Sequence, residues 1–233
     1  MSIQDYSDPV LRGMPRGKIA IIPVGSLEQH GPHLPISTDS DIVTEVARIV
    51  AKRCDLLLLP TITYGNSFEH APFFNLSITT GTLQRILVEI CLSLSQNKIQ
   101  KIIILNGHHG NQGAIKGIES RIHAKSGRRA RVFAFSYWHF MKEEFDHAGF
   151  VETSLMLAIS DKVKMKFARK GLISGDLTPR QRERVSKLAA THFIKATKNG
   201  VWGDPTKATK KDGERILSEI TQNISKTVSK LAY

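Results

Sequence analysis

The sequence has few cysteines and no long apolar run. Its 233 residues include only Cys54 and Cys91, each in an apolar stretch. Their spacing fits neither a metal knuckle nor a redox pair, so we expect buried thiols. No stretch reaches the roughly 18 uninterrupted apolar residues of a membrane span, and the first residues, MSIQDYSDP, lack the apolar segment of a signal peptide. We therefore expect a cytoplasmic protein with no membrane partner.

Acidic residues are scarce in the last third of the chain. Residues 160–233 carry 17 Lys and Arg against 7 Asp and Glu, whereas residues 1–159 carry 16 against 14, and the net charge is +12. Such an excess attracts phosphates or nucleic acid through long-range electrostatics. A basic face without a dedicated partner is more common, so we do not expect nucleic acid as the partner. The alternative from another class is a nucleic-acid or anion-binding protein with a structural metal site.

The remaining composition is typical of a globular protein, with 41% apolar and 23% charged residues. No repeat or linker is visible, and we predict one domain over residues 1–233. Apolar runs alternate with amphipathic stretches, which predicts an α/β fold: a three-layer sandwich whose mostly parallel central sheet is flanked by helices. The predicted strands are Ile19–Val24, Leu56–Ile62, Lys101–Leu105 and Ala130–Phe135.

Helical spacing of apolar residues appears between and after these strands. It predicts helices around residues 42–50 and 83–94, one after Asn111, one over Glu152–Ile159 and a last one over Lys211–Leu231. Residues 162–198 give no clear pattern.

Unusual polar clusters follow each predicted strand directly. They occupy Glu28–His33, Tyr64–His70, Asn106–Asn111 and Tyr137–His139. Open α/β sheets gather their ligand sites at the carboxyl ends of the strands, so these four clusters should meet at one edge.

The first and third clusters contain the residue types that bind metals. Glu28, His30 and Asp39 offer two carboxylates and an imidazole within twelve residues, a set that suits zinc or manganese. Asp39 alone would more simply be a helix N-cap. His108 adds an imidazole between two glycines that allow a tight turn. Core packing gives no reason to gather four such side chains from two strand ends in one place. We therefore predict a metal site.

Glu152 precedes an apolar helix, and its role stays open at this stage. It fits a charge favoured by the helix dipole, a ligand of a second metal, or an acid or base. His147, five residues earlier, is our candidate for transferring a proton to the leaving nitrogen, because an unperturbed imidazole titrates near pH 6.5.

These residues resemble the creatininase (creatinine amidohydrolase) family over most of the chain. The most specific part is residues 23–35, PVGSLEQHGPHLP, followed by Thr38 and Asp39. Further agreement comes from residues 106–108, 136–138, 147–157 and 203–209.

The resemblance implies an enzyme, a metal-dependent amidohydrolase of this fold. It implies two divalent ions per chain, zinc or manganese, with iron in some branches. Their ligands would be Glu28, His30, His108 and a bridging Asp39. The substrate would be a small molecule, either neutral or anionic, whose amide or cyclic amide bond is cut by metal-activated water. The family also implies a homo-oligomer, with a hexamer as one form that the resemblance suggests.

Two departures from creatininase proper bear on the substrate. Creatininase has a metal-binding Glu two residues after the histidine that matches His108, where this chain has Gly110. Glu152 is therefore our candidate for the missing carboxylate. The Asn-Gly-His-x-Gly-Asn form is typical of other branches, among them a deformylase of a phosphorylated formamidopyrimidine and a peptidase acting on a modified peptide.

The second departure is at residues 74–78, where many relatives read Phe-Pro-Gly-Thr-Ile and this chain reads FNLSI. We expect that loop to face the substrate. The predicted substrate-binding residues are His70, Ser77, His109 and Trp138, with simple packing an equal alternative for Trp138.

Overall fold

Parallel strands form the central sheet in the computed structural model, which describes residues 2–15 and 17–231. Within these residues the strands are β1 (Ile19–Val24), β2 (Leu57–Leu58), β3 (Lys101–Asn106) and β4 (Arg131–Ser136). They lie in the order β2, β1, β3, β4, and each pairing is parallel. Three of them agree with the predicted strands to within one residue, because short aliphatic runs buried on both faces favour parallel strands.

The second strand is much shorter than predicted. We predicted Leu56–Ile62, but β2 ends at Leu58. Pro60 has no N–H to donate, and it interrupts the regular pairing. The chain still follows β1 beyond this point, since the N–H of Ile62 donates to the carbonyl of Pro23 over 3.0 Å. The loop that follows therefore still leaves from the same edge of the sheet.

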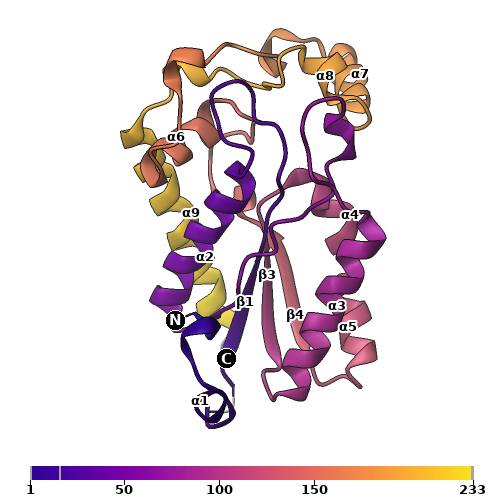
Figure 1. Ribbon diagram of the computed structural model, residues 1–233, viewed down its shortest axis with the longest axis vertical. Helices are drawn as coiled ribbons and strands as arrows, with labels where there is room; N and C mark the ends of the chain where they lie inside the picture. The colour runs from indigo at the N-terminus through magenta and orange to yellow at the C-terminus, as the bar shows by residue number, and fades with distance from the viewer. Residues whose placement is uncertain (1, 16, 232–233) are drawn as a thin grey trace.

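Helices cover both faces of the sheet, as predicted for a three-layer fold (Figure 1). The first face carries α2 (Thr38–Cys54), α6 (Phe150–Ile159) and α9 (Lys210–Leu231), and the second carries α3 (Thr80–Gln96), α4 (Gln112–Ile115) and α5 (Ile118–Lys125). A short α1 (Asp8–Arg12) precedes β1. Among the described residues, no helix combines the length and the apolar character needed to cross a bilayer.

Two segments differ from the sequence-based expectation. The single helix predicted after Asn111 is two helices, α4 and α5, because the chain turns at Gly117, whose φ of 68° lies in the left-handed region. The segment without a clear pattern contains α7 (Pro179–Ala189) and α8 (Phe193–Thr197), which lie beyond the end of the sheet (Figure 1). The single domain over residues 1–233 stays a prediction; residues 1, 16, 232 and 233 lie outside the described part.

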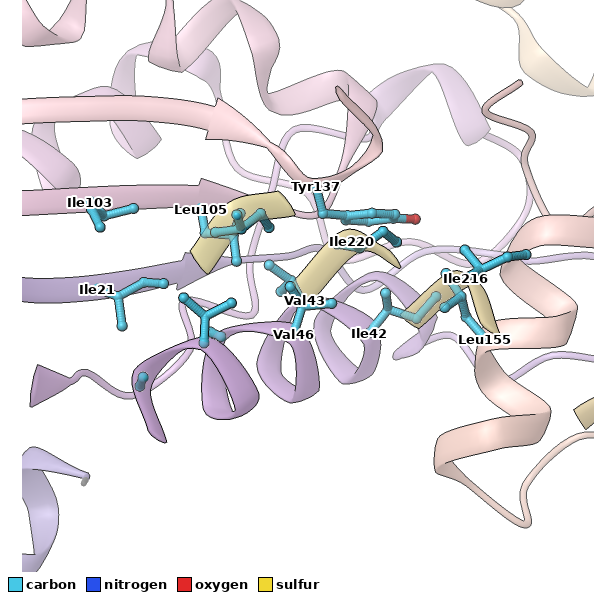
Figure 2. Close-up of a cluster of buried hydrophobic side chains, with 14 of the residues drawn as sticks. Ile21, Ile42, Val43, Val46, Ile103, Leu105, Tyr137, Leu155, Ile216 and Ile220 are labelled. Carbon is cyan, nitrogen blue, oxygen red and sulfur yellow. The ribbon is translucent and has the colours of Figure 1, made fainter. Parts of the chain in front are cut away.

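Alternate residues of each strand point into two separate cores. Ile21, Ile103 and Leu105 pack on the helices of the first face, whereas Ile22 and Ile104 pack on those of the second. Figure 2 shows the first core, where strand side chains meet residues of α2, α6 and α9. Burial on both faces fixes the register of the strands, because a slip by one residue would exchange the two sets.

Close packing of α6 against α9 fixes the position of α6, which carries Glu152. Gly213 of α9 faces the backbone carbonyl of Ser154, and a Cβ at Gly213 would overlap that oxygen. The two helices can approach this closely because glycine has no side chain. Glu152, Thr153 and Ser154 are consequently buried between elements of the first layer.

Candidate metal centre

The carboxyl ends of β1 and β3 bring the predicted ligands together. Glu28 and His30 lie in the loop after β1, Asp39 in the first turn of α2, and His108 directly after β3. All four side chains are buried, with exposed fractions of 0 to 3%. Glu152, from the first turn of α6, completes what we call the carboxylate–imidazole cluster: Glu28, His30, Asp39, His108 and Glu152.

Asp39 lies at the centre of this cluster. Its Oδ1 is 3.3 Å from Nε2 of His30, and its Oδ2 is 3.0 Å from Nδ1 of His108. The N-cap residue of α2 is Ser37, so the helix-cap alternative for Asp39 is wrong. Each carboxylate oxygen faces a different imidazole, which is the arrangement that a ligand bridging two ions requires.

Backbone carbonyls orient both imidazoles. Nδ1 of His30 lies 3.1 Å from the carbonyl oxygen of Glu28, and Nε2 of His108 lies 2.7 Å from that of Asn66. These nitrogens donate their protons to the carbonyls. The opposite nitrogens face Asp39 and can offer a lone pair, the usual arrangement of metal-binding histidines.

Glu28 is held by three neighbours. Its Oε1 lies 3.1 Å from Nε2 of His70, and its Oε2 lies 3.1 Å from Nε2 of His108 and accepts from the Ser26 hydroxyl over 3.0 Å. A carboxylate with this many partners has a fixed direction. His70, which we predicted to bind substrate, is thus also placed to orient Glu28.

Gln29 sets the proton position on His70, a role that sequence reasoning missed. The Oε1 of Gln29 accepts from the N–H of Gly31 over 2.9 Å, so its amide nitrogen must point the other way. That nitrogen donates to Nδ1 of His70 over 2.9 Å. His70 therefore carries its proton on Nε2, facing Glu28. The only sequence signal was the position of Gln29 between two predicted ligands.

Glu152 points inward, which settles the direction that the sequence left open. Its Oε2 lies 3.5 Å from Nε2 of His30 and accepts from the N–H of Ala148 over 2.6 Å. Asp146, not Glu152, caps the N-terminus of α6, because its carboxylate accepts from the N–H groups of Val151 and Glu152. Sequence reasoning missed Asp146, although an acidic residue shortly before a helix is a known capping signal.

Charges within the cluster perturb its pKa values strongly. Burial alone would lower the pKa of His30, but Asp39 and Glu152 outweigh it and raise this pKa to about 10. Burial opposes protonation of His108 as well, yet Glu28 and Asp39 raise its pKa to about 10. Burial would raise the pKa of Asp39, but the two imidazoles hold it well below its usual range. The metal-free cluster therefore carries protons where a cation would bind.

The pKa values of Glu152 and His147 shift so that the neutral form of each side chain is favoured. Burial raises the pKa of Glu152 to about 8, with His30 opposing the rise. Burial, reinforced by the charges of His30 and His70, lowers the pKa of His147 well below its usual range. The Nε2 of His147 lies 3.1 Å from the carbonyl oxygen of Gln29 and 3.2 Å from its amide nitrogen, so these contacts are compatible with a proton on either ring nitrogen.

Several buried polar atoms of the cluster make no well-aligned hydrogen bond within the described chain, although imidazole or carboxylate groups lie 3.0 to 3.3 Å from some of them. They are Oε1 of Glu28, Nε2 of His30, Oδ2 of Asp39 and Oε1 of Glu152. Leaving such atoms unpaired is costly unless a cation satisfies them. The mixed set of imidazole nitrogens and carboxylate oxygens is the donor chemistry of zinc and manganese.

Three groups of side chains have ligand atoms close enough to share an ion. They are Glu28, Asp39 and His108; His30, His147 and Glu152; and Glu28, His70 and His147. Asp39 belongs to the first group, and its other oxygen faces His30 of the second group. Its carboxylate could therefore connect an ion in the first group with an ion in the second. The residues present thus fit a pair of divalent ions.

Two asparagines hold the loop that presents His108. The Oδ1 of Asn106 accepts from the N–H of His108 over 3.1 Å, and its amide donates back to the His108 carbonyl over 2.8 Å. Asn111 donates to Asn106 and, over 3.0 Å, to the carbonyl of Gly25. The Asn-Gly-His-x-Gly-Asn segment is therefore a support for one imidazole.

Gly110 is needed for space in this loop. A Cβ at this position would overlap the carbonyl oxygen of Asn66 and stand 2.5 Å from Nε2 of His108, the two atoms whose hydrogen bond orients that ring. We expect Gly110→Ala to weaken divalent metal binding roughly tenfold to a hundredfold, the range typical of lost support for a ligand. Titration calorimetry with Zn²⁺ and Mn²⁺ measures this.

Gly113→Ala is the matched control for Gly110→Ala. A Cβ at Gly113 would meet nothing closer than 3.5 Å, so this variant should bind metal like the wild type. Equal metal affinities in both variants would contradict the steric role of Gly110.

A cavity of about 330 Å³ opens beside the cluster. Imidazoles of His70, His108, His109 and His147 reach it, together with the carboxylates of Glu28, Asp39, Glu69, Asp146 and Glu152. The rest of the wall is mainly apolar and comes from Phe145, Ala189, Ala190, Phe193 and Trp202. The segment around α7 and α8, which had no clear sequence pattern, thus contributes part of the wall.

Two predicted substrate-binding residues lie away from this cavity wall. Trp138 stacks on Phe145 with ring centroids 4.5 Å apart, so it supports a residue of the wall. The hydroxyl of Ser77 accepts from the N–H of Ser67 over 2.8 Å and shapes the loop before His70.

Comparison with known proteins agrees with the fold. The sequence profile of the creatininase family, described as creatinine amidohydrolase, matches residues 5–228. The chain is 32% identical over 219 residues to a mycofactocin precursor peptide peptidase of Mycolicibacterium smegmatis, covering 91% of this chain and 85% of the relative. It is 29% identical over 170 residues to creatinine amidohydrolase of Pseudomonas putida, covering 60% and 64%.

Solved structures show the same architecture. A crystal structure of creatinine amidohydrolase (creatininase) superposes with a TM-score of 0.82 at 25% identity, covering 98% of this chain and 96% of that one. Given the matched span and the shared fold, this chain belongs to the creatininase family of enzymes that hydrolyse carbon–nitrogen bonds.

Proposed function

We propose that this protein hydrolyses an amide bond of a small molecule or short peptide at a centre of two divalent ions. The observation that carries the proposal is Asp39, a buried carboxylate whose two oxygens face His30 and His108. Glu28 would join His108 on one side, and Glu152 would join His30 on the other. Zinc and manganese suit these donors best, with iron possible.

The ions would supply activation of a water molecule and stabilisation of negative charge on the attacked carbonyl oxygen. The side chains around them have separate tasks. Gln29 and His70 keep Glu28 in one orientation, while the backbone carbonyls of Glu28 and Asn66 fix the two imidazoles.

His147 is our choice for handling the proton of the leaving nitrogen. Its ring lines the cavity, 4.3 Å from that of His30 and 5.0 Å from that of His70. We assign the proton transfer to Nδ1, because Nε2 already lies within hydrogen-bond distance of two groups of Gln29. Glu152 is the alternative acid or base if it does not hold an ion.

Metal reconstitution tests the proposal. Protein stripped with a chelator should be inactive, and after loading with Zn²⁺ or Mn²⁺ it should contain about two ions per chain by mass spectrometry. The loaded protein should then hydrolyse one class among creatinine, formamides, a formamidopyrimidine phosphate and short peptides. Full metal loading without turnover of any amide, together with a salt-sensitive shift of RNA or duplex DNA, would instead favour the nucleic-acid-binding alternative.

The expected cytoplasmic location and homo-oligomeric state stay predictions. Gel filtration with light scattering measures the oligomeric state directly.

A further inference from the structure

The cavity contains a carboxylate that the candidate metal centre does not use. Of the five carboxylates that line it, Glu28, Asp39 and Glu152 belong to the carboxylate–imidazole cluster. Asp146 accepts hydrogen bonds from the first turn of α6. Glu69 remains, half-buried in a short 3-10 helix over Phe68–His70.

No cationic side chain of the described chain lies within ion-pairing distance of Glu69, although the imidazoles of His70 and His108 are near enough to act on its charge. It is absent from the ion pairs, and its oxygens lie outside the three groups of side chains that can share an ion. The wall of the cavity includes neither lysine nor arginine among the described residues. The positive charge of the last third of the chain therefore supplies no neutralising group at this wall.

The position of Glu69 depends on Gly110. The Oε1 of Glu69 lies 3.0 Å from the place where a Cβ at Gly110 would stand, and that place is 2.5 Å from Nε2 of His108. The missing side chain at Gly110 thus leaves room for a carboxylate from a different loop. Glu69 reaches the cavity beside the cluster without belonging to it.

We propose that Glu69 selects substrates that place a cationic or N–H-donating group beside the bond to be cut. This inference rests on the function proposed above. A substrate that covers Glu69 removes water from its carboxylate, and that loss is costly unless the substrate offers a positive charge or a donor in return. A phosphate or carboxylate at the same place would be repelled, so the residue also discriminates against anionic substrates.

The apolar wall adds a second requirement. Phe193 of α8 packs with its ring centroid 4.6 Å from that of His70 and 4.7 Å from that of His147. Phe145 and Trp202 extend this apolar surface. The substrate class is accordingly an amide with an amine, guanidine or amide N–H near the scissile bond and an apolar body.

Binding of three small hydroxamates to metal-loaded protein tests the charge selection without relying on turnover. Hydroxamates bind metal through a common head group, and the three differ in the adjacent charge: glycine hydroxamate is cationic, acetohydroxamate is neutral and malonic monohydroxamate is anionic. We expect calorimetry to show the wild type binding the cationic compound about tenfold more tightly than the neutral one, and the anionic compound most weakly.

Glu69→Gln keeps the size of the side chain and removes its charge. In this variant the three affinities should agree to within about twofold, while the metal content stays at the wild-type value. Glu89→Gln changes the net charge equally on the exposed face of α3 and should keep the wild-type order.

The outcomes separate the inference from the proposed function. Bound metal with no charge preference in the wild type, or a preference unchanged in Glu69→Gln, overturns the role of Glu69 alone. A wild-type protein that takes up no divalent metal overturns the metal-dependent function and this inference with it.

Discussion

His30→Ala should lose most of the bound divalent metal and, with it, the hydrolytic activity. The imidazole faces both Asp39 and Glu152, so its removal takes away a nitrogen ligand, leaves Glu152 without its nearest counter-charge and leaves Asp39 with one imidazole fewer. We expect the metal content of dialysed protein to fall from about two ions per chain to below one. Mass spectrometry of the metal and an amide hydrolysis assay measure both effects.

His139→Ala is the control for this experiment. His139 is an exposed histidine outside the cavity wall, so its loss should leave metal content unchanged. Circular dichroism of both variants establishes that they are folded. A folded His30→Ala protein with the normal metal content would remove the basis of the assignment.

Metal affinity should rise steeply with pH across the neutral range. The pKa values of His30 and His108 are raised to about 10 in the metal-free protein, so each ring carries an extra proton that an ion must displace. Each displaced proton makes the apparent affinity rise about tenfold per pH unit, until the slope levels off near pH 10. Between pH 6 and pH 8 we expect roughly a hundredfold increase for an ion that displaces one proton.

Calorimetry in buffers with different ionisation enthalpies counts the released protons directly.

The stability of the metal-free protein should fall, not rise, as the pH increases. A histidine whose pKa is raised on folding contributes its full stabilisation below the unfolded value of 6.5, and that contribution is lost as the pH rises toward 10. A metal affinity independent of pH between 6 and 8 would show that the two imidazoles are not the ligands.

The strands of the sheet were predictable because burial on both faces leaves a simple signature. Continuous aliphatic runs such as residues 19–24 and 101–105 have few alternatives to a central parallel strand. The errors came where one residue changed the local geometry, at Pro60 in the second strand and at Gly117 between α4 and α5. The segment with α7 and α8 had no clear pattern because α7 is almost wholly exposed, and Ala189 is its one buried residue.

The predicted ligands could be found because strand ends concentrate functional residues. Glu28, His30 and His108 stand out as polar residues directly after apolar runs. Gln29 and Glu69 lie inside the polar clusters and Asp146 stands shortly before a helix, but these positions did not reveal their roles, which depend on contacts that only the folded structure shows. Gln29, for example, acts through His70, which is 41 positions away.

The sequence by itself determined the alternation of strands and helices, the family resemblance and the residue types available for a metal centre. These follow from local periodicity and from short motifs, which neighbouring residues specify. The tertiary structure decided which oxygen of Asp39 faces which imidazole, that Glu152 turns inward and that Glu69 enters the cavity beside Gly110. Those facts depend on the packing of distant segments against one sheet edge, and that packing fixes side-chain directions that linear spacing does not encode.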